Sequence, residues 1–206
     1  APRREPARAD LRPRAAHGDA PSRTTLTRRL PAFLALFAIG AVGLTLLDSV
    51  HVHTRTLYYD HPFAYGSAWW VPLLMGSAAS CGGMLYVAGW ERLDGPAKLP
   101  KWGAVLRALV AFAMLYAASG LLPATATTKL VVLAIGALVI WREVDGTRAG
   151  AILIVLGAVL GTTAEAVNPA FHYVTPDFAR VPIWLPALYA CVTPALGQLA
   201  RRLAAR

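Results

Sequence analysis

The chain has 206 residues, of which 56% are hydrophobic and only 15% are charged. Soluble globular domains carry about a quarter of charged residues, so this composition excludes an ordinary soluble domain and indicates a protein built for lipid. The 20 basic residues outnumber the 11 acidic ones and gather in the tails and between the apolar runs, as in a polytopic membrane protein.

The N-terminal segment, residues 1–29, is rich in Arg and Pro and nearly lacks large apolar side chains. Such a composition cannot form a packed core, so we predict a disordered basic tail that signals topology and contacts anionic lipid. Nucleic acid is not an expected partner, because no aromatic residues interleave the charges. An organellar transit peptide is the alternative for an Arg-rich, acid-poor leader.

The remaining residues, 30–206, are predicted to form one transmembrane domain. Its six apolar stretches are each about long enough to cross a bilayer, provided that the fourth extends back through Thr125. These stretches are residues 30–47, 68–89, 102–120, 128–141, 149–167 and 183–200. The fold class is therefore all-α, a polytopic membrane protein with six transmembrane helices. Gly157 and Gly161 have the four-residue spacing that lets helices pack closely.

The distribution of Lys and Arg predicts the orientation. These residues concentrate in the N-terminal tail, the second and fourth connectors and the C-terminal tail, whereas the opposite connectors carry Arg55, Lys129 and Arg180. Cytoplasmic loops retain positive charge, so both termini are expected in the cytoplasm.

The first outer connector, "DSVHVHTRTLYYDHP" (48–62), gathers three His residues with Asp48 and Asp60. These residue types ligate zinc, but His51 and His53 are two positions apart and share a face only on a strand. An interfacial polar loop is therefore favoured over a metal site, and no metal is predicted.

Glu165 is the only acidic residue within an apolar run. An intramembrane carboxylate indicates a functional site, although its place near the end of the run also lets it reach headgroups or water. The chain has no nucleotide-binding loop, no nucleophile elbow and no paired inner carboxylates, so we predict neither an enzyme nor a cofactor.

Three polar and aromatic segments mark helix ends. "GSAWWVP" (66–72) opens the second helix with Trp69 and Trp70 at headgroup depth, and "WREVDGTRAG" (141–150) is the inner turn between the fourth and fifth helices. "YVTPDFARVPIWLP" (173–186) is predicted to form a rigid outer corner, in which Trp184 anchors the sixth helix at the interface. The corner is built on Pro176, Asp177, Phe178 and Trp184.

Together these segments resemble the Insig family. Residues 67–72 match the family's Ser-Ala-Trp-Trp-Val-Pro throughout, and Asp145, Arg148 and Gly150 match its inner turn. The family's outer corner, Tyr-Thr-Ser-Pro-Asp-Phe followed by Trp-Leu-Pro, is met by Tyr173, Pro176, Asp177, Phe178, Trp184, Leu185 and Pro186. Asn168 also falls where the family has Asn, and the matches keep their order over roughly residues 35–203.

The resemblance implies a six-helix protein with a lipid-binding cavity, which holds oxysterol in animal members and diacylglycerol-type lipid in bacterial homologues. Candidate lipid contacts are Trp69, Trp70, Asn168 and Glu165. The family turn implies that Asp145, with Arg148, forms a partner-docking patch. An alternative role for the two residues is simply to pair within the turn.

The Ala-, Arg- and Gly-heavy composition fits a bacterial version in the inner membrane, with an endoplasmic-reticulum location and a polytopic partner such as Scap expected only of a eukaryotic one. A homo-oligomer is expected from bacterial relatives. Two other functions stay open: a small transporter or channel that uses Glu165 and the His-rich outer loop, and a scaffold that recruits partners.

Overall fold

The structure of the protein, a computed structural model, describes the backbone of residues 23–205 and the side chains from Arg29 onward. Most of the predicted basic tail, residues 1–22, lies outside the described residues. The first helix begins at Arg23, so residues 23–29 of that tail belong to it.

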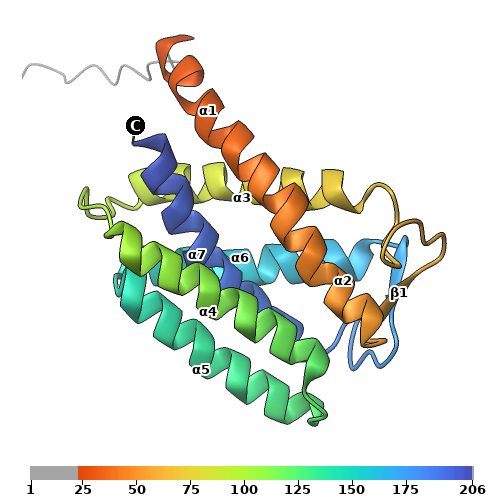
Figure 1. Cartoon of the computed structure of the whole chain (residues 1–206). Coiled ribbons are helices and arrows are strands. Elements are labelled where there is room, and N and C mark those ends of the chain that lie inside the picture. The colour runs from red at the N-terminus through yellow and green to blue at the C-terminus, as the bar shows by residue number, and fades with distance from the viewer. Residues whose placement is uncertain (1–22, 206) are drawn as a thin grey trace, which may run out of the picture.

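Within the described residues, six long helical segments form a bundle (Figure 1). The first segment is continuous but changes type twice, because a π-helical turn, η1 (Gly40–Leu44), joins α1 (Arg23–Ile39) to α2 (Thr45–His53). The other five are α3 (Val71–Arg92), α4 (Trp102–Leu121), α5 (Ala126–Val144), α6 (Arg148–Val167) and α7 (Leu185–Ala204). The helical membrane fold expected from the sequence is therefore present, with two short strands added to it.

Among the residues that the structure describes, four segments are long and apolar enough to cross a membrane: Arg29–His53, Val71–Arg92, Trp102–Leu121 and Arg148–Val167. The two remaining helices fall outside this group because of their polar or charged residues. α5 carries Lys129, Arg142 and Glu143 near its ends, and α7 carries Gln198 and two Arg residues. A helix that other helices surround does not need an apolar face toward lipid, and α7 is such a helix.

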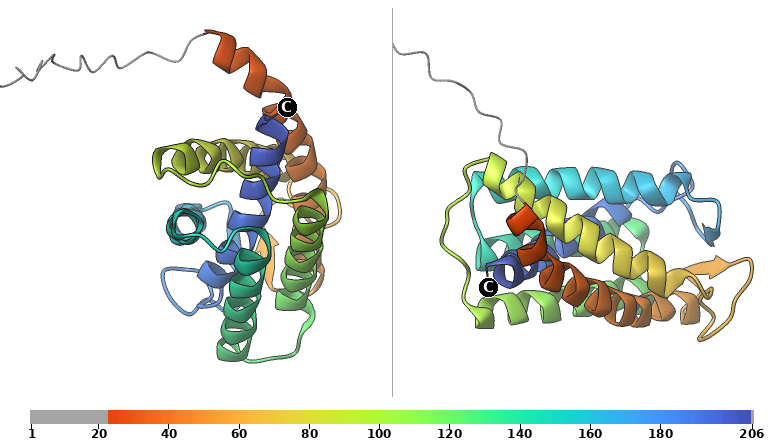
Figure 2. Two further views of the ribbon diagram at one scale, coloured as in Figure 1. Left: turned by 90° about the vertical axis from the view of Figure 1, so that its left-hand side faces the viewer. Right: turned by 90° about the horizontal axis from the view of Figure 1, so that it is seen from above.

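α7 packs against α1, α3, α4, α5 and α6 and is the centre of the bundle (Figures 1 and 2). Close approach depends on glycine: a Cβ atom added at Gly197 would lie 2.4 Å from the ring of Tyr86 on α3. The predicted small-residue pair on α6 has the same role, because Gly157 faces Thr193 and Gly161 faces Tyr189. α5 and α6 each pack on α7 but not along one another, and Figure 2 shows them diverging.

The strands close one end of the bundle, which we call the outer cap. β1 (Leu57–Tyr59) pairs antiparallel with β2 (Phe171–Tyr173), with Tyr58 opposite His172. The described termini, the α3–α4 connector and the α5–α6 turn lie at the opposite end (Figure 1). The cap therefore fastens the α2–α3 hairpin to the α6–α7 hairpin.

These two hairpins are copies of one unit, which the sequence analysis did not identify. Identical residues recur 114 positions apart at Tyr59 and Tyr173, Pro62 and Pro176, Trp70 and Trp184, and Pro72 and Pro186. Backbone hydrogen bonds recur as well: Ser67 N donates to Ala64 O at 3.0 Å, and Val181 N donates to Phe178 O at 2.8 Å. Both copies run through the bundle in the same direction, so the repeat is parallel and not inverted.

The contact of Gly161 with Tyr189 is testable against a glycine that touches nothing. A Cβ atom at Gly161 would lie 2.1 Å from the Tyr189 ring, whereas a Cβ atom at Gly82 would meet nothing within 4 Å. Both substitutions to Ala gain similar helix propensity. We expect Gly161→Ala to lower the free energy of unfolding by about 1–3 kcal/mol relative to Gly82→Ala, as overpacking does. Unfolding of the purified variants in detergent measures this, and equal stability would contradict the packing.

Candidate functional site

A groove of about 370 Å³ runs along the membrane-facing side of α6. α7 and the outer corner complete its walls, no α5 residue closes it, and all but two of its lining side chains are apolar. The lining residues are Ile154, Val155, Ala158, Val159, Thr162, Thr163, Phe178, Pro186 and Ala190. A groove of this kind accepts an elongated apolar molecule from the surrounding bilayer.

Glu165 lies behind the outer part of this groove. Its carboxylate accepts hydrogen bonds from the hydroxyl groups of Tyr173 and Tyr189, both at 2.5 Å. Burial raises the pKa of Tyr173, which keeps this hydroxyl protonated as a donor. Both oxygen atoms of Glu165 are thus held by protein groups, and the side chain points into the bundle instead of toward headgroups.

A second carboxylate occupies the first repeat. Asp48 is 2% exposed and accepts hydrogen bonds from Tyr59 at 2.7 Å and from Ser67 at 3.4 Å. Burial also raises the pKa of Tyr59, so this hydroxyl is a donor too. Each repeat therefore buries one carboxylate beneath the outer cap and satisfies it with a tyrosine from its strand.

The prediction of an outer polar loop over residues 48–62 is wrong for its first part, because α2 continues through His53. His51 is 1% exposed, lies 2.8 Å from the Ser119 hydroxyl and stacks on Tyr116. The first apolar stretch was predicted to end at residue 47 because the polar side chains of Asp48 and His51 follow it, although both are buried in the helix. In the described part of the chain, no group of three metal-ligating side chains occurs.

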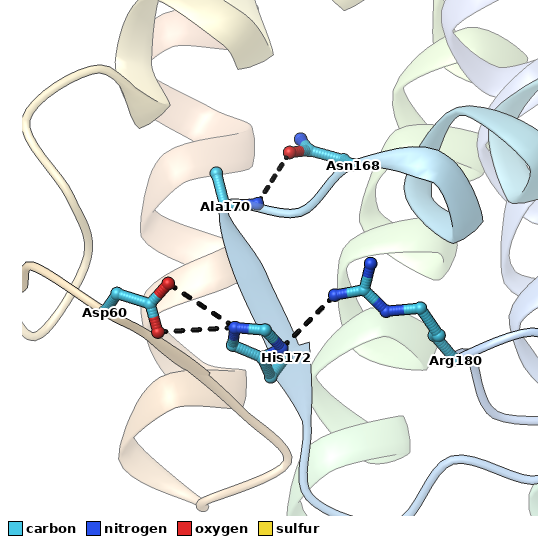
Figure 3. A network of polar contacts seen from close by, with 5 residues as sticks. All are labelled: Asp60, Asn168, Ala170, His172 and Arg180. Atoms are coloured by element: carbon cyan, nitrogen blue, oxygen red, sulfur yellow. Dashed lines mark hydrogen bonds and ion pairs between the residues drawn. The ribbon is translucent and has the colours of Figure 1, made fainter.

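A polar network joins the two repeats on the surface of the cap (Figure 3). His172 Nε2 lies 3.3 Å from Asp60 Oδ1, and an Arg180 nitrogen lies 3.3 Å from His172 Nδ1. Since Arg180 only donates, Nδ1 accepts and Nε2 carries the proton toward Asp60. The network fixes the ring of His172 between a residue of the first repeat and one of the outer corner.

The outer corner is a tight turn closed by a bridge between Phe178 and Val181. Its two central residues, Ala179 and Arg180, both have positive φ, at 44° and 70°. Such a backbone costs on the order of 1 kcal/mol for each non-glycine residue, so the surrounding contacts must hold it. Asp177 supplies one contact, since its carboxylate accepts a hydrogen bond from Ile183 N at 2.8 Å. Pro176 precedes it on the exposed side of the turn.

Trp184 does not anchor the corner at the membrane interface. It is 4% exposed and lies edge-on to the rings of His51 and Tyr173. Trp184 is the N-cap residue of α7 and its side chain faces the bundle. The Pro-rich sequence of the segment does not indicate this direction. The indole therefore packs the core beneath the cap.

The other predicted contacts lie at the outer end of the bundle but outside the groove lining. Trp69 is 67% exposed, and Trp70 is half-buried against Tyr59. Asn168 ends α6, and its Oδ1 accepts a hydrogen bond from Ala170 N at 3.0 Å (Figure 3).

Of the four candidates, Glu165 is the nearest to the groove, because it bonds Tyr189, which is next to the lining residue Ala190. Sequence reasoning assigned Phe178 to the outer corner but not to the groove lining, and it missed Thr162, although Thr162 and Thr163 form a polar pair inside an apolar run.

The inner turn places Asp145 and Arg148 differently. Asp145 Oδ1 accepts a hydrogen bond from Thr147 N at 3.0 Å, and a Cβ atom at Gly150 would overlap the carboxylate. Burial raises the pKa of Asp145. Arg148 is exposed, and no ion pair joins it to Asp145 among the described residues. Asp145 is thus an integral part of the turn, while Arg148 stands apart from it.

Comparison with known proteins agrees with this architecture. No family model matches the chain. The insulin-induced gene 1 proteins of Bos taurus and Homo sapiens are 32% and 31% identical to it, over 83% and 86% of its length. The chain spans 65% of the length of the bovine relative and 67% of the human one.

A mycobacterial Insig homolog, MvINS from Mycobacterium vanbaalenii, has a similar fold. Its crystal structure matches with a TM-score of 0.75 and 24% identity, covering 86% of this chain and 96% of that one. A cross-linked trimer of MvINS has also been solved and matches equally well.

The identity, the coverage and the order of the helix-end segments lead to one conclusion. The chain is an integral membrane protein of the Insig family.

Proposed function

We propose that this protein binds a diacylglycerol- or sterol-type lipid in the groove between α6 and α7 and acts as a lipid sensor or regulator. The observation that carries the proposal is the groove itself, which is apolar, open toward the bilayer and about 370 Å³ in volume. No α5 residue lines the groove, because α5 and α6 pack on α7 and not along each other.

The outer end of the groove supplies the polar contacts. Thr162 and Thr163 lie there on α6, and Pro186 and Ala190 lie near the start of α7. The inner part is lined only by apolar side chains such as Ile154 and Val155. A lipid would therefore enter with its head toward the cap and its chains toward the middle of the bilayer.

The predicted contacts take different parts in this proposal. Glu165 supports the wall of the groove by holding Tyr189. Trp69 and Asn168 contact headgroups at the outer interface, and Trp70 supports the cap through Tyr59. Both oxygen atoms of Glu165 are occupied by tyrosines, an arrangement that does not favour the transporter or channel alternative.

The inner end of the bundle is the proposed docking side. Arg148 is exposed at the first residue of α6, three positions after the part-buried Asp145, whose carboxylate closes the turn. The cytoplasmic placement of the termini, a bacterial inner-membrane location and a homo-oligomer are proposals that the family and the solved MvINS trimer support. A Scap-like partner is proposed only for a eukaryotic setting.

Filling the groove tests the proposal. We expect Ala158→Phe to reduce the lipid that stays with the purified protein at least tenfold, because the ring would occupy the space between α6 and α7. Native mass spectrometry with lipidomics in mild detergent measures the bound species. Ala78→Phe, on the exposed side of α3, is the matched control and should keep the wild-type lipid. Bulk lipid in membrane proportions on the wild type would contradict the proposal.

Removing one tyrosine hydroxyl tests the supporting role of Glu165. We expect Tyr189→Phe to lower the free energy of unfolding by about 1–3 kcal/mol, because the Glu165 carboxyl inside the bundle loses a hydrogen-bond donor. Tyr65→Phe, at a position that is 86% exposed, should have no measurable effect. Thermal unfolding of both variants in one detergent compares them, and equal melting temperatures would remove Glu165 from the structural account.

A further inference from the structure

We infer that His172 is a pH-sensitive latch on the outer corner: its neutral ring holds the side chain of Arg180, and protonation of the ring releases Arg180 and loosens the turn between Phe178 and Val181. The latch belongs to the cap and works whatever molecule occupies the groove. Three observations support it: the hydrogen-bond geometry of His172, the strained backbone at Arg180, and the equivalent turn of the first repeat.

The ring of His172 lies between an anion and a cation (Figure 3). Its Nε2 lies 3.3 Å from Asp60 Oδ1, and its Nδ1 accepts a hydrogen bond from Arg180 at 3.3 Å. The third titratable group in contact with it is Tyr58 on β1, whose ring centroid lies 5.2 Å away. The His172 side chain is 33% exposed, so a proton can reach the ring from water.

Protonation of this ring has opposite effects on its two polar contacts. Arg180 has only donors, so Nδ1 can hold it only while that nitrogen carries no proton. A proton on Nδ1 removes the acceptor and places two cations at hydrogen-bond distance, whereas it turns the contact with Asp60 into an ion pair. Histidine is the side chain that ordinarily changes its charge between pH 5 and 8. As the pH falls through this range, the ring therefore stays on Asp60 and Arg180 leaves.

The contact with Arg180 matters because of the backbone that carries it. Arg180 has a φ of 70°, a conformation that favours glycine. The equivalent turn of the first repeat has Gly66 at this place, with a φ of 78°, and Tyr58 at the position of His172. The first repeat thus makes the same turn without a latch. In the second repeat, the hydrogen bond of the Arg180 side chain is one of the contacts that offset the strain.

Loss of this contact loosens the corner without unfolding it. Phe178 N still donates to Val181 O at 3.1 Å, Val181 N to Phe178 O at 2.8 Å, and Ile183 N to the Asp177 carboxylate at 2.8 Å. Phe178 also lines the groove, so the turn that loosens is the one at its outer mouth. The expected response to acid is faster local opening of these hydrogen bonds and no change of fold.

Hydrogen–deuterium exchange of the full chain in mild detergent, read by mass spectrometry, tests the latch. Peptides that cover residues 177–183 are compared at about pH 7.5 and about pH 5.5, after correction for the intrinsic pH dependence of exchange. Aspartate side chains ordinarily titrate near pH 4, below this range. We expect the corner amides of the wild type to exchange about twofold to tenfold faster at the lower pH, the worth of one hydrogen bond. The equivalent turn of the first repeat, residues 63–69, is the internal control and should not respond.

Three variants separate His172 from the other histidines. His172→Asn keeps an acceptor near the place of Nδ1 but cannot be protonated, so its corner should exchange at the same corrected rate at both pH values. Arg180→Gly should also lose the response, whereas Ala179→Gly relieves strain at the neighbouring positive-φ residue and should keep it. The inference is overturned by equal rates at both pH values in the wild type, or by an equal response in the control turn. A response that persists in His172→Asn or Arg180→Gly, or that Ala179→Gly abolishes, overturns it as well.

Discussion

The packing of five helices around α7 is the constraint on which the other features depend. α7 touches α1, α3, α4, α5 and α6, so it tolerates Gln198 and Arg201, side chains that lipid would not accept. α5 and α6 contact different sides of α7, so they do not pack along each other. A groove beside α6 is a geometric consequence of this arrangement, because two helices that lean on a third from different sides cannot also close on each other.

The outer cap makes that arrangement rigid. An intramembrane carboxylate is expensive unless it is fully hydrogen-bonded, and the protein contains two of them, Asp48 and Glu165, beneath the same strand pair. Their tyrosine donors, Tyr59 and Tyr173, lie on β1 and β2, so the strands hold the carboxylates while the carboxylates fix the strands. The strained turn at Ala179 and Arg180 persists on this support and places Phe178 at the mouth of the groove.

Hydropathy and helix-end patterns predicted the helical membrane fold and the family, because apolar length and turn residues are local properties. They could not say which way a side chain faces. Trp184 was expected at the interface and is buried, since the first turn of α7 faces the bundle. α2 extends to His53 because Tyr59, on the next strand, satisfies Asp48, and Ser119, 68 residues farther on, satisfies His51. A hydropathy pattern does not detect such partners. The groove was invisible for the same reason: it follows from how α6 meets α7.

The two repeats show how one hairpin unit closes its surface in one half of the protein and leaves a groove in the other. In the first repeat the helices are sealed, since a Cβ atom at Gly40 would lie 2.6 Å from the carbonyl of Met75, and Asp48 has its donors within the chain. In the second, the equivalent of Gly40 is Ile154 and the equivalent of Asp48 is Thr162, and both line an open groove. Ile154 adds a side chain where Gly40 has none, and the Thr162 hydroxyl has no hydrogen-bond partner among the described residues, whereas Asp48 has two. The same hairpin unit thus packs tightly in one half and forms the wall of a groove in the other.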